Sequence, residues 1–322
     1  MNTDNRIAIL TPVLDDWESF TTLVRRIAAV FTDSGASVRV FAIDDGSLTP
    51  FDPRSVLLPP ETDVRSVSIV RLAANLGHQR AIAVGLSMLA KRDDIDFVVV
   101  MDSDGEDSPE DIRALRTASR GHPGHAVLAQ RAKRSERGIF RAGYALYKVL
   151  FRMLTGLTID FGNFCWLPMP IVRRLVYMPE LWNNLAAALI RSRVALTSVP
   201  LARGTRYAGQ SKMNLPSLVV HGLSAMSVHT DIIFVRIILL ACIVSGLTAL
   251  GIVTVTMIRL LTNLGVPGWA SAVVGNLIVI LVQTLVMVIA TCLVLLAGRS
   301  QRPIVPIADT SIYIAEVIEM GD

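Results

Sequence analysis

The sequence is poor in cysteine and in charged residues, and both shortages exclude classes of protein. Only 3 of its 322 residues are cysteine, and the wide separation of Cys165, Cys242 and Cys292 excludes a disulfide framework and the close spacing of a zinc site. Charged residues make up 18% of the chain and are unevenly placed. The amino-terminus has early charges and no long apolar segment, so we expect no signal peptide.

Charge is missing altogether from two long apolar segments near the carboxyl-terminus. No charged residue occurs from Ile237 to Ile258 or from Leu260 to Gly298. A helix that crosses a bilayer needs about 20 mostly apolar residues, so the sequence predicts two membrane spans, at roughly 235–258 and 270–296. A buried hairpin of a soluble protein is the alternative, and it is a poor explanation for two adjacent segments of this length. We therefore expect a two-helix transmembrane domain at 231–300.

The basic residues around the two predicted spans give them an orientation. The outer flanks carry Arg203, Arg206 and Lys212 before the first span, and Arg299 and Arg302 after the second. The connecting loop carries only Arg259. Because positive loops stay on the cytoplasmic side, both large flanks are expected in the cytoplasm, as in a multi-pass protein of the cell inner membrane. The pI of about 9.2 suits a domain that lies against anionic lipid.

Residues 1–230 predict one α/β domain. Apolar runs typical of strands occur at Ile7–Leu10, Val38–Ile43, Val64–Leu72 and Asp96–Met101. They alternate with helical apolar spacing at Trp17–Phe31 and Ala81–Leu89. This alternation favours a Rossmann-like, mostly parallel sheet with helices on both faces.

Three further segments carry weaker predictions. Helices at about 137–155 and 214–229 are expected to lie in the membrane interface, since the first has a basic stripe beside aromatic residues. An ordinary surface helix with a solvated basic face is the alternative for that first segment. Residues 301–322 are expected to form a cytoplasmic tail, with a strand at Ser311–Ile318 that could pair with another protomer.

Four carboxylates follow the strand predicted at Asp96–Met101, within the segment Asp102–Asp107. Asp102 and Asp104 project to the same side for as long as the strand continues. Open α/β sheets bind ligands at the carboxyl ends of their strands, and Mg²⁺ is usually held by one or two carboxylates together with phosphate oxygens. A metal site for a nucleotide is one reading. An acidic turn that caps the helix starting near Ser108 is the other.

Two more polar clusters follow predicted strands, at Thr11–Asp16 and at Asp44–Ser47. In a parallel sheet all three clusters would line one crevice. Asp-Gly-Ser is by itself a common turn, so the second cluster has a purely structural reading as well. Three clusters at successive strand ends favour a binding site.

With these motifs the sequence resembles the family 2 glycosyltransferases of the GT-A fold, and among them the polyprenyl-phosphate glycosyltransferases related to dolichol-phosphate mannose synthase. The family's Asp-Ala-Asp-Leu-Gln motif aligns with Asp102–Glu106, and its Arg-x-x-Gly-x-Ser-Lys motif aligns with Arg206–Lys212. The two spans resemble those of the bacterial branch that uses undecaprenyl phosphate. Three positions depart from the family pattern: His78 replaces a lysine, Asn163 an acidic residue and Cys165 an arginine.

The resemblance implies a role for each matched residue. It implies a nucleotide site formed by Pro12, Asp16, Asp44, Asp45 and Asp102. It implies a divalent metal, Mg²⁺ or Mn²⁺, held by Asp102, Asp104 and Glu106. It implies catalytic contacts, chiefly to phosphate, from Asp104, Arg206, Ser211 and Lys212. Arg131, after the predicted strand Ala126–Ala129, is a further catalytic candidate by position, and a plain surface charge is its alternative.

The implied activity is an inverting, metal-dependent transfer of a sugar from a nucleotide sugar, with UDP favoured, to a polyprenyl phosphate. The resemblance implies a homo-oligomer, with a tetramer as one form, and no nucleic-acid partner is expected. A catalytically inactive, membrane-anchored binding or scaffold protein of the same fold is the alternative. A polymerising synthase would need more spans and a Gln-x-x-Arg-Trp motif. A transporter would need ionisable groups within its spans. The sequence does not identify the sugar.

Overall fold

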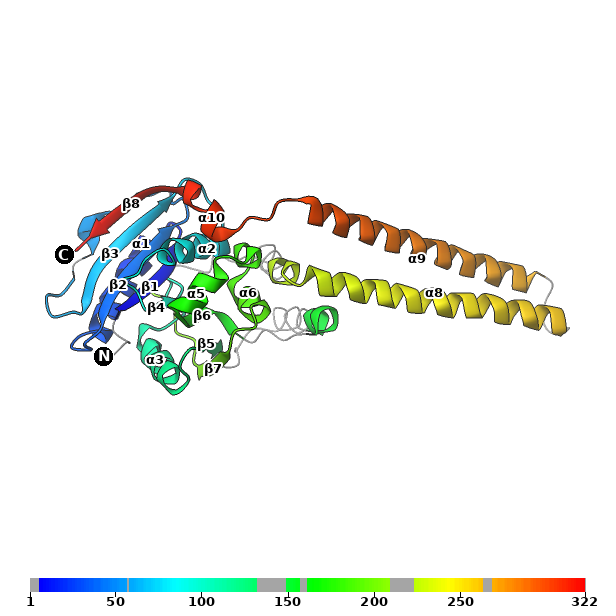
Figure 1. The fold of residues 1–322 in the computed structure, drawn as a ribbon, viewed down its shortest axis with the longest axis horizontal. Helices are drawn as coiled ribbons and strands as arrows, with labels where there is room; N and C mark the ends of the chain where they lie inside the picture. Colours follow the sequence, from blue (N-terminus) through cyan, green and yellow to red (C-terminus); the bar gives the residue numbers. More distant parts are fainter. Residues whose placement is uncertain are drawn as a thin grey trace. The chain divides into compact units, whose positions relative to one another are not determined.

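The computed structural model describes residues 6–56, 58–131, 149–156, 161–208, 223–262 and 268–321. The chain divides into two units (Figure 1). The first unit comprises Met1–Ala145, Thr158–Val228 and Ile304–Asp322, and the second comprises Leu146–Leu157 and His229–Pro303. The carboxyl-terminal segment therefore belongs to the first unit, whereas the sequence predicted a separate tail at 301–322.

Eight strands of the first unit form one mixed sheet with the order β7-β5-β6-β4-β1-β2-β3-β8. The strands are β1 (Arg6–Val13), β2 (Ser37–Asp44), β3 (Val64–Leu72), β4 (Phe97–Val100), β5 (Ala126–Arg131), β6 (Phe161–Pro168), β7 (Leu196–Leu201) and β8 (Ile314–Met320). Strands β6 and β8 run antiparallel to their neighbours, and the other pairs are parallel. The predicted α/β class with a largely parallel sheet is confirmed.

Helices cover both faces of the sheet. One face packs against α1 (Trp17–Val30) and α3 (Ile112–Gly121). The other packs against α2 (His78–Leu89), α5 (Met169–Leu175) and α6 (Leu185–Arg191). The central strands β1 and β4 are buried except at their first residues, because helices cover both faces of the sheet.

Strand β8 forms one edge of the sheet, beside β3 (Figure 1). Its pairing is antiparallel, with Val67 opposite Met320 and Val70 opposite Val317. The strand expected in the carboxyl-terminal segment therefore exists, and it pairs with β3 of its own chain. The pairing of β3 with β8 closes a long stretch of chain. The entropic cost of closing it is modest, since that cost rises only slowly with loop length.

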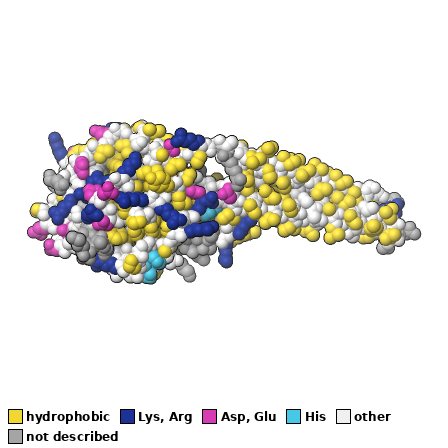
Figure 2. All heavy atoms as spheres, viewed as in Figure 1, with side chains coloured by type: hydrophobic (Ala, Val, Ile, Leu, Met, Phe, Trp, Pro, Cys, Tyr) yellow, Lys and Arg dark blue, Asp and Glu magenta, His cyan; other side chains and the backbone are white. Residues whose placement is uncertain are grey.

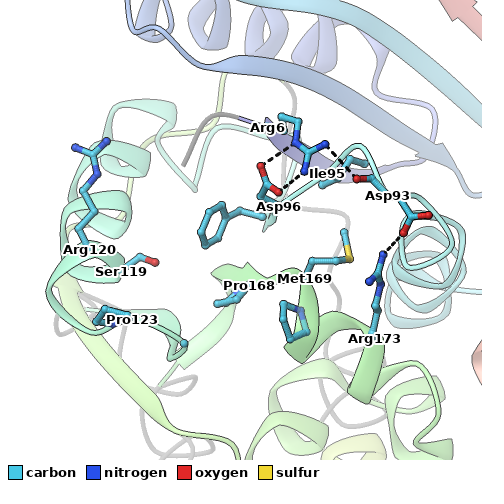
Figure 3. Close-up of a pocket in the computed structure, with 13 residues that line it drawn as sticks. Arg6, Asp93, Ile95, Asp96, Ser119, Arg120, Pro123, Pro168, Met169 and Arg173 are labelled. Atoms are coloured by element: carbon cyan, nitrogen blue, oxygen red, sulfur yellow. Dashed lines mark hydrogen bonds and ion pairs between the residues drawn. The ribbon is translucent and has the colours of Figure 1, made fainter. Parts of the chain in front are cut away.

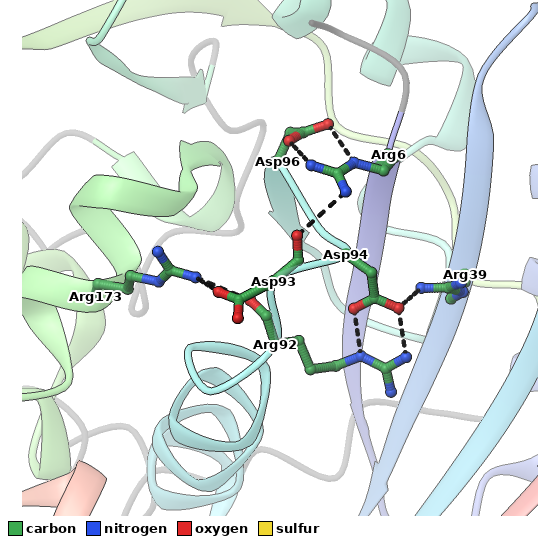
Figure 4. A network of polar contacts seen from close by, with 7 residues as sticks. All are labelled: Arg6, Arg39, Arg92, Asp93, Asp94, Asp96 and Arg173. Atoms are coloured by element: carbon green, nitrogen blue, oxygen red, sulfur yellow. Dashed lines mark hydrogen bonds and ion pairs between the residues drawn. The ribbon is translucent and has the colours of Figure 1, made fainter.

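Ion pairs join side chains near the amino-terminal ends of the central strands β1 and β4 (Figure 4). Arg6 binds Asp96 through two nitrogens, at 2.6 and 2.9 Å. Asp94 lies between Arg39 and Arg92, and Arg173 of α5 reaches Asp93 at 2.6 Å. A cavity of about 600 Å³ opens beside these side chains, and none of the predicted site residues lines it (Figure 3). We regard this end of the sheet as structural, because the charged side chains named above are paired with one another.

The second unit contains two long apolar helices, α8 (Thr230–Leu261) and α9 (Trp269–Ser300). By length and composition both could cross a membrane, with mean hydropathies of 2.5 and 2.8. Their side chains are largely exposed, and Figure 2 shows hydrophobic side chains along both helices. Of the expected interfacial helices, residues 149–155 and 223–227 are helical, and the remainder lies largely outside the described residues.

Candidate active site

The three polar clusters singled out in the sequence lie together at the carboxyl ends of the strands β1, β2 and β4. Strand β1 pairs in parallel with β2 on one side and with β4 on the other, so their carboxyl ends lie together. The backbone confirms this, since the Asp45 amide donates to the Val13 carbonyl at 2.9 Å and the Met101 amide to the Leu10 carbonyl at 3.1 Å. The side chains that follow these strands therefore lie at the same end of the sheet, where open α/β sheets bind ligands.

The turns after β1 and β2 are locked to each other by short side chains. Asp15 accepts hydrogen bonds from the amides of Leu48 and Thr49 at 2.8 and 3.2 Å, and its own amide donates to the Ser47 hydroxyl. Asp44 is buried and accepts from the Ser47 amide at 2.8 Å. Asp16 precedes α1 without capping it, so its half-exposed carboxylate is not used by the helix.

Two of the residues predicted to bind the nucleotide are instead engaged in contacts within the fold. Pro12 is buried inside β1, opposite Ile43 of β2. Asp45 is buried and accepts from the amides of Leu76 and Gly77, at 2.7 and 2.9 Å, where α2 begins. Burial raises the pKa of Asp45, and these two amides oppose the rise. Pro12 and Asp45 therefore support the turns structurally. Asp16 and Asp44 remain the candidate carboxylates for contacting the nucleotide.

The acidic segment after β4 is a turn, because the strand ends at Val100. The alternation expected of a strand persists nevertheless, since the side chains of Asp102, Asp104 and Glu106 are 21%, 14% and 17% exposed. Asp107 points inward and accepts from the Asp102 amide at 3.0 Å. Burial and the charge of Asp102 raise the pKa of Asp104. Three partly buried carboxylates thus share one side of the turn and require positive charge nearby.

Two arginines supply that charge from a segment about 100 residues further along the chain. Arg206 contacts Asp104 at 2.6 Å and Glu106 at 3.3 Å, and Arg203 contacts Glu106. The backbones are joined as well, by hydrogen bonds of 2.9 Å from the Gly204 amide to the Glu106 carbonyl and from the Tyr207 amide to the Asp104 carbonyl. We call residues 203–207 the arginine strap.

Arg203 was not among the predicted site residues. Arg203 lies three residues before Arg206, but the family motif begins at Arg206, so the sequence predicts for Arg203 only a charge that sets membrane orientation. Burial lowers the pKa of Arg203, and the nearby carboxylates oppose that effect.

Carboxylate oxygens are suitable ligands for a divalent cation, although these carboxylates do not form a complete coordination shell. Within the described part of the chain, no three His, Cys, Asp or Glu side chains are grouped as metal ligands. The ion pairs explain this, since Asp104 and Glu106 turn their oxygens toward Arg203 and Arg206. Magnesium sites built from one or two carboxylates plus phosphate oxygens and water need no such cage.

The family departures His78 and Asn163 lie together beside Asp102. Gln79 accepts from the Leu185 amide and donates to Asn163 Oδ1 at 3.0 Å, which directs Asn163 Nδ2 toward His78 Nε2, also at 3.0 Å. The same His78 nitrogen lies 3.2 Å from Asp102 Oδ1. Burial lowers the pKa of His78, but the carboxylates, Asp102 first, outweigh it and leave the pKa raised. His78 thus places a titratable ring nitrogen against Asp102.

Three predicted catalytic residues are not placed by these contacts. Arg131 is the last residue of β5, which runs parallel to β7, and only its backbone is described. Ser211 and Lys212 lie outside the described residues.

Comparison with known proteins identifies the class and then the family. The fold is the GT-A fold: the structure of glucosyl-3-phosphoglycerate synthase from Mycobacterium tuberculosis superposes with a TM-score of 0.51 at 15% identity, covering 71% of this chain and 80% of that protein. The glycosyl transferase family 2 model matches residues 9–174, more than half of the sequence, and this chain belongs to that family of enzymes.

Curated proteins with similar sequences include undecaprenyl-phosphate 4-deoxy-4-formamido-L-arabinose transferases. The protein from Salmonella dublin is 26% identical over 226 residues, and that from Erwinia tasmaniensis is 25% identical over 226 residues. The Salmonella alignment covers 66% of this chain and spans 64% of the relative's length. The resemblance to family 2 drawn from the motifs is confirmed.

Proposed function

We propose that this protein transfers a sugar from a nucleoside diphosphate sugar, with UDP favoured, to a polyprenyl phosphate at the cytoplasmic face of the inner membrane. One observation carries the proposal: three carboxylates and two arginines meet at the edge of the sheet where GT-A-like folds bind ligands. The names of the curated relatives and the two apolar helices support the lipid acceptor.

The donor would bind along the carboxyl ends of β1, β2 and β4. Asp16 and Asp44 are assigned to the base and ribose, as the family resemblance implies. Asp102, Asp104 and Glu106 would hold Mg²⁺ or Mn²⁺, and the neighbouring synthase was crystallised with Mn²⁺. When bound, the cation would supply neutralising charge for the departing diphosphate.

The strap arginines would bind phosphate once the carboxylates no longer hold them. A guanidinium offers a planar pair of N–H donors that matches two phosphate oxygens, whereas an ammonium acts as a point charge. Arg206 and Arg203 are therefore assigned to the diphosphate. Ser211 and Lys212, from the same family motif, and Arg131 are assigned to the second anion, the lipid phosphate.

The acceptor needs no strong general base, because its phosphate is already an anion at neutral pH. One acceptor oxygen attacks the anomeric carbon while the bond from that carbon to the diphosphate oxygen breaks, which inverts the configuration. Asn163 in place of an acid is compatible with this reaction. The apolar helices would keep the enzyme at the depth of the lipid phosphate and raise its local concentration.

The test is a transfer assay with the full-length chain in detergent. A panel of radiolabelled nucleotide sugars would be offered with a short polyprenyl phosphate, with Mg²⁺ or Mn²⁺ and with EDTA. We expect one donor to yield an organic-extractable product that EDTA abolishes. Asp104→Asn should lower the rate by about 100-fold or more, since a metal contributes several kcal/mol to charge stabilisation.

The matched control is Asp94→Asn, which makes the same chemical change near the amino-terminal ends of the strands, away from the site. It should leave transfer unchanged. No transfer from any donor by folded protein would contradict the proposal and favour the inactive binding or scaffold protein.

A further inference from the structure

The arginine strap lies unusually close to the acidic turn, and glycine at two positions allows it. A Cβ at Gly204 would lie 2.4 Å from the Gly105 carbonyl oxygen. A Cβ at Gly105, whose φ is +90°, would lie 2.7 Å from the ring of Tyr207. The strap and the turn are therefore packed backbone against backbone, with the Tyr207 ring lying on Gly105.

Tyr207 is in turn held from outside by α1. Arg26 Nη1 donates to the Tyr207 hydroxyl at 3.1 Å, and its guanidinium carbon lies 5.2 Å from the centre of the Tyr207 ring. Arg26 is itself fixed by Glu110, through hydrogen bonds of 3.1 and 2.6 Å to the two carboxylate oxygens. Glu110 also accepts from the Ser108 hydroxyl. This chain of contacts joins α1, the strap and the segment just after the acidic turn.

These contacts do not belong to the predicted nucleotide, metal or phosphate ligands. Arg26 and Glu110 have side chains that are 40% and 50% exposed, so their ion pair contributes little to overall stability. A bidentate pair that also stacks on an aromatic ring does, however, fix direction, because a guanidinium satisfies both partners in only one plane. The arrangement is suited to orienting the strap more than to stabilising the fold.

We propose that Arg26 and Tyr207 are positioning residues that hold the arginine strap over the acidic turn, so that Arg206 stays at the diphosphate when the carboxylates release it. This inference rests on the proposed function. Besides the two backbone hydrogen bonds between strap and turn, the contact of Arg26 with Tyr207 is a link that persists when the Arg206 ion pairs are lost. With this link, only the guanidinium has to turn.

The experiment compares Arg26→Gln with Arg25→Gln in the full-length chain. Both residues are on α1 and both changes remove one positive charge, but Arg25 is exposed and outside these contacts. We expect Arg26→Gln to lower kcat about tenfold at saturating donor while the KM of the lipid acceptor stays within twofold. Tyr207→Phe, which keeps the ring on Gly105 and loses only the hydroxyl, should show a smaller fall of the same kind.

Hydrogen exchange gives a second readout that does not depend on activity. Peptides containing residues 203–207 should exchange several-fold faster in Arg26→Gln than in wild type or Arg25→Gln, because the Gly204 and Tyr207 amides lose their carbonyl partners more often. If Arg26→Gln matches Arg25→Gln in both kcat and exchange, the inference is wrong. If wild type shows no transfer, the proposed function fails, and the exchange comparison alone decides the inference.

Discussion

Replacing Arg206 with glutamine should tighten metal binding and at the same time remove most sugar transfer. In the structure, Arg206 occupies one oxygen of Asp104 at 2.6 Å and one of Glu106 at 3.3 Å. A divalent cation must compete with that guanidinium for the same oxygens. Transfer needs the guanidinium afterwards, at the diphosphate. The two measurements should therefore move in opposite directions, which a merely damaged site would not show.

The size of the effect follows from the contact. Two unit charges 2.6 Å apart attract each other by about 6 kcal/mol at an effective dielectric of about 20. Desolvation and partial exposure, 27% for Arg206 and 14% for Asp104, reduce this to the ~1–3 kcal/mol typical of charged hydrogen bonds. Since 1.4 kcal/mol is a factor of ten, Mn²⁺ should bind roughly 5- to 150-fold more tightly. Removing a nearby positive charge acts in the same direction.

The assay is a titration of the donor-free, full-length protein with Mn²⁺, followed by electron paramagnetic resonance. Arg25→Gln is the control for charge alone. The pKa of Asp104 is already raised, and losing Arg206 raises it further, so protons compete for this carboxylate as the pH falls. The gain in affinity should therefore be larger at pH 8 than at pH 5. Unchanged or weaker Mn²⁺ binding in Arg206→Gln would refute the competition between arginine and metal.

Two further predictions follow from single contacts. Gly105→Ala should destabilise the protein by about 1–3 kcal/mol and lower transfer, because the new Cβ would lie 2.7 Å from the Tyr207 ring in a left-handed conformation. Unfolding curves in detergent test this, and a stability equal to wild type would contradict it. Asp94→Asn should cost up to ~1 kcal/mol at pH 7, since Arg92 and Arg39 hold the pKa of this exposed carboxyl below its usual range. That stability is fully present above the unfolded pKa of about 4 and is lost only as the pH falls through the lowered folded pKa, so the difference between the two proteins should shrink steadily as the pH is taken below 4. A difference that does not shrink as the pH falls would show that the cause is not the charge.

Local patterns in the sequence predicted the elements that surround the site. Strand β3 was expected at Val64–Leu72 and occurs there residue for residue, and α1 starts at the expected Trp17. Each of these segments contains within itself the repeating pattern of apolar residues that identifies a strand or a helix. The meeting of the polar clusters also followed, because parallel neighbours place their carboxyl ends at one edge.

Pairings between distant segments could not be predicted in this way. Strand β6 contains glycine, asparagine, cysteine and tryptophan with no clear period, and only its antiparallel contacts with β4 and β5 define it. There Cys165 is a fully buried core residue whose pKa is raised by burial, which explains why it need not carry the family's arginine. The partnership of Arg203 with Glu106 is equally non-local: Arg203 lies three residues before Arg206, but nothing in the sequence pairs it with Glu106.

Three acids of the turn each lie against a basic side chain, and that arrangement links the resting site to the proposed reaction. Asp102 contacts His78, Asp104 contacts Arg206 and Glu106 contacts Arg203, so none of the three partly buried charges lies without compensation. A diphosphate arriving with a divalent cation brings both the positive charge that the carboxylates need and the negative charge that the arginines need. The site can therefore exchange its partners and keep its net charge nearly constant. Such an exchange avoids the desolvation cost of exposing unpaired ions, which is large wherever charges are partly buried.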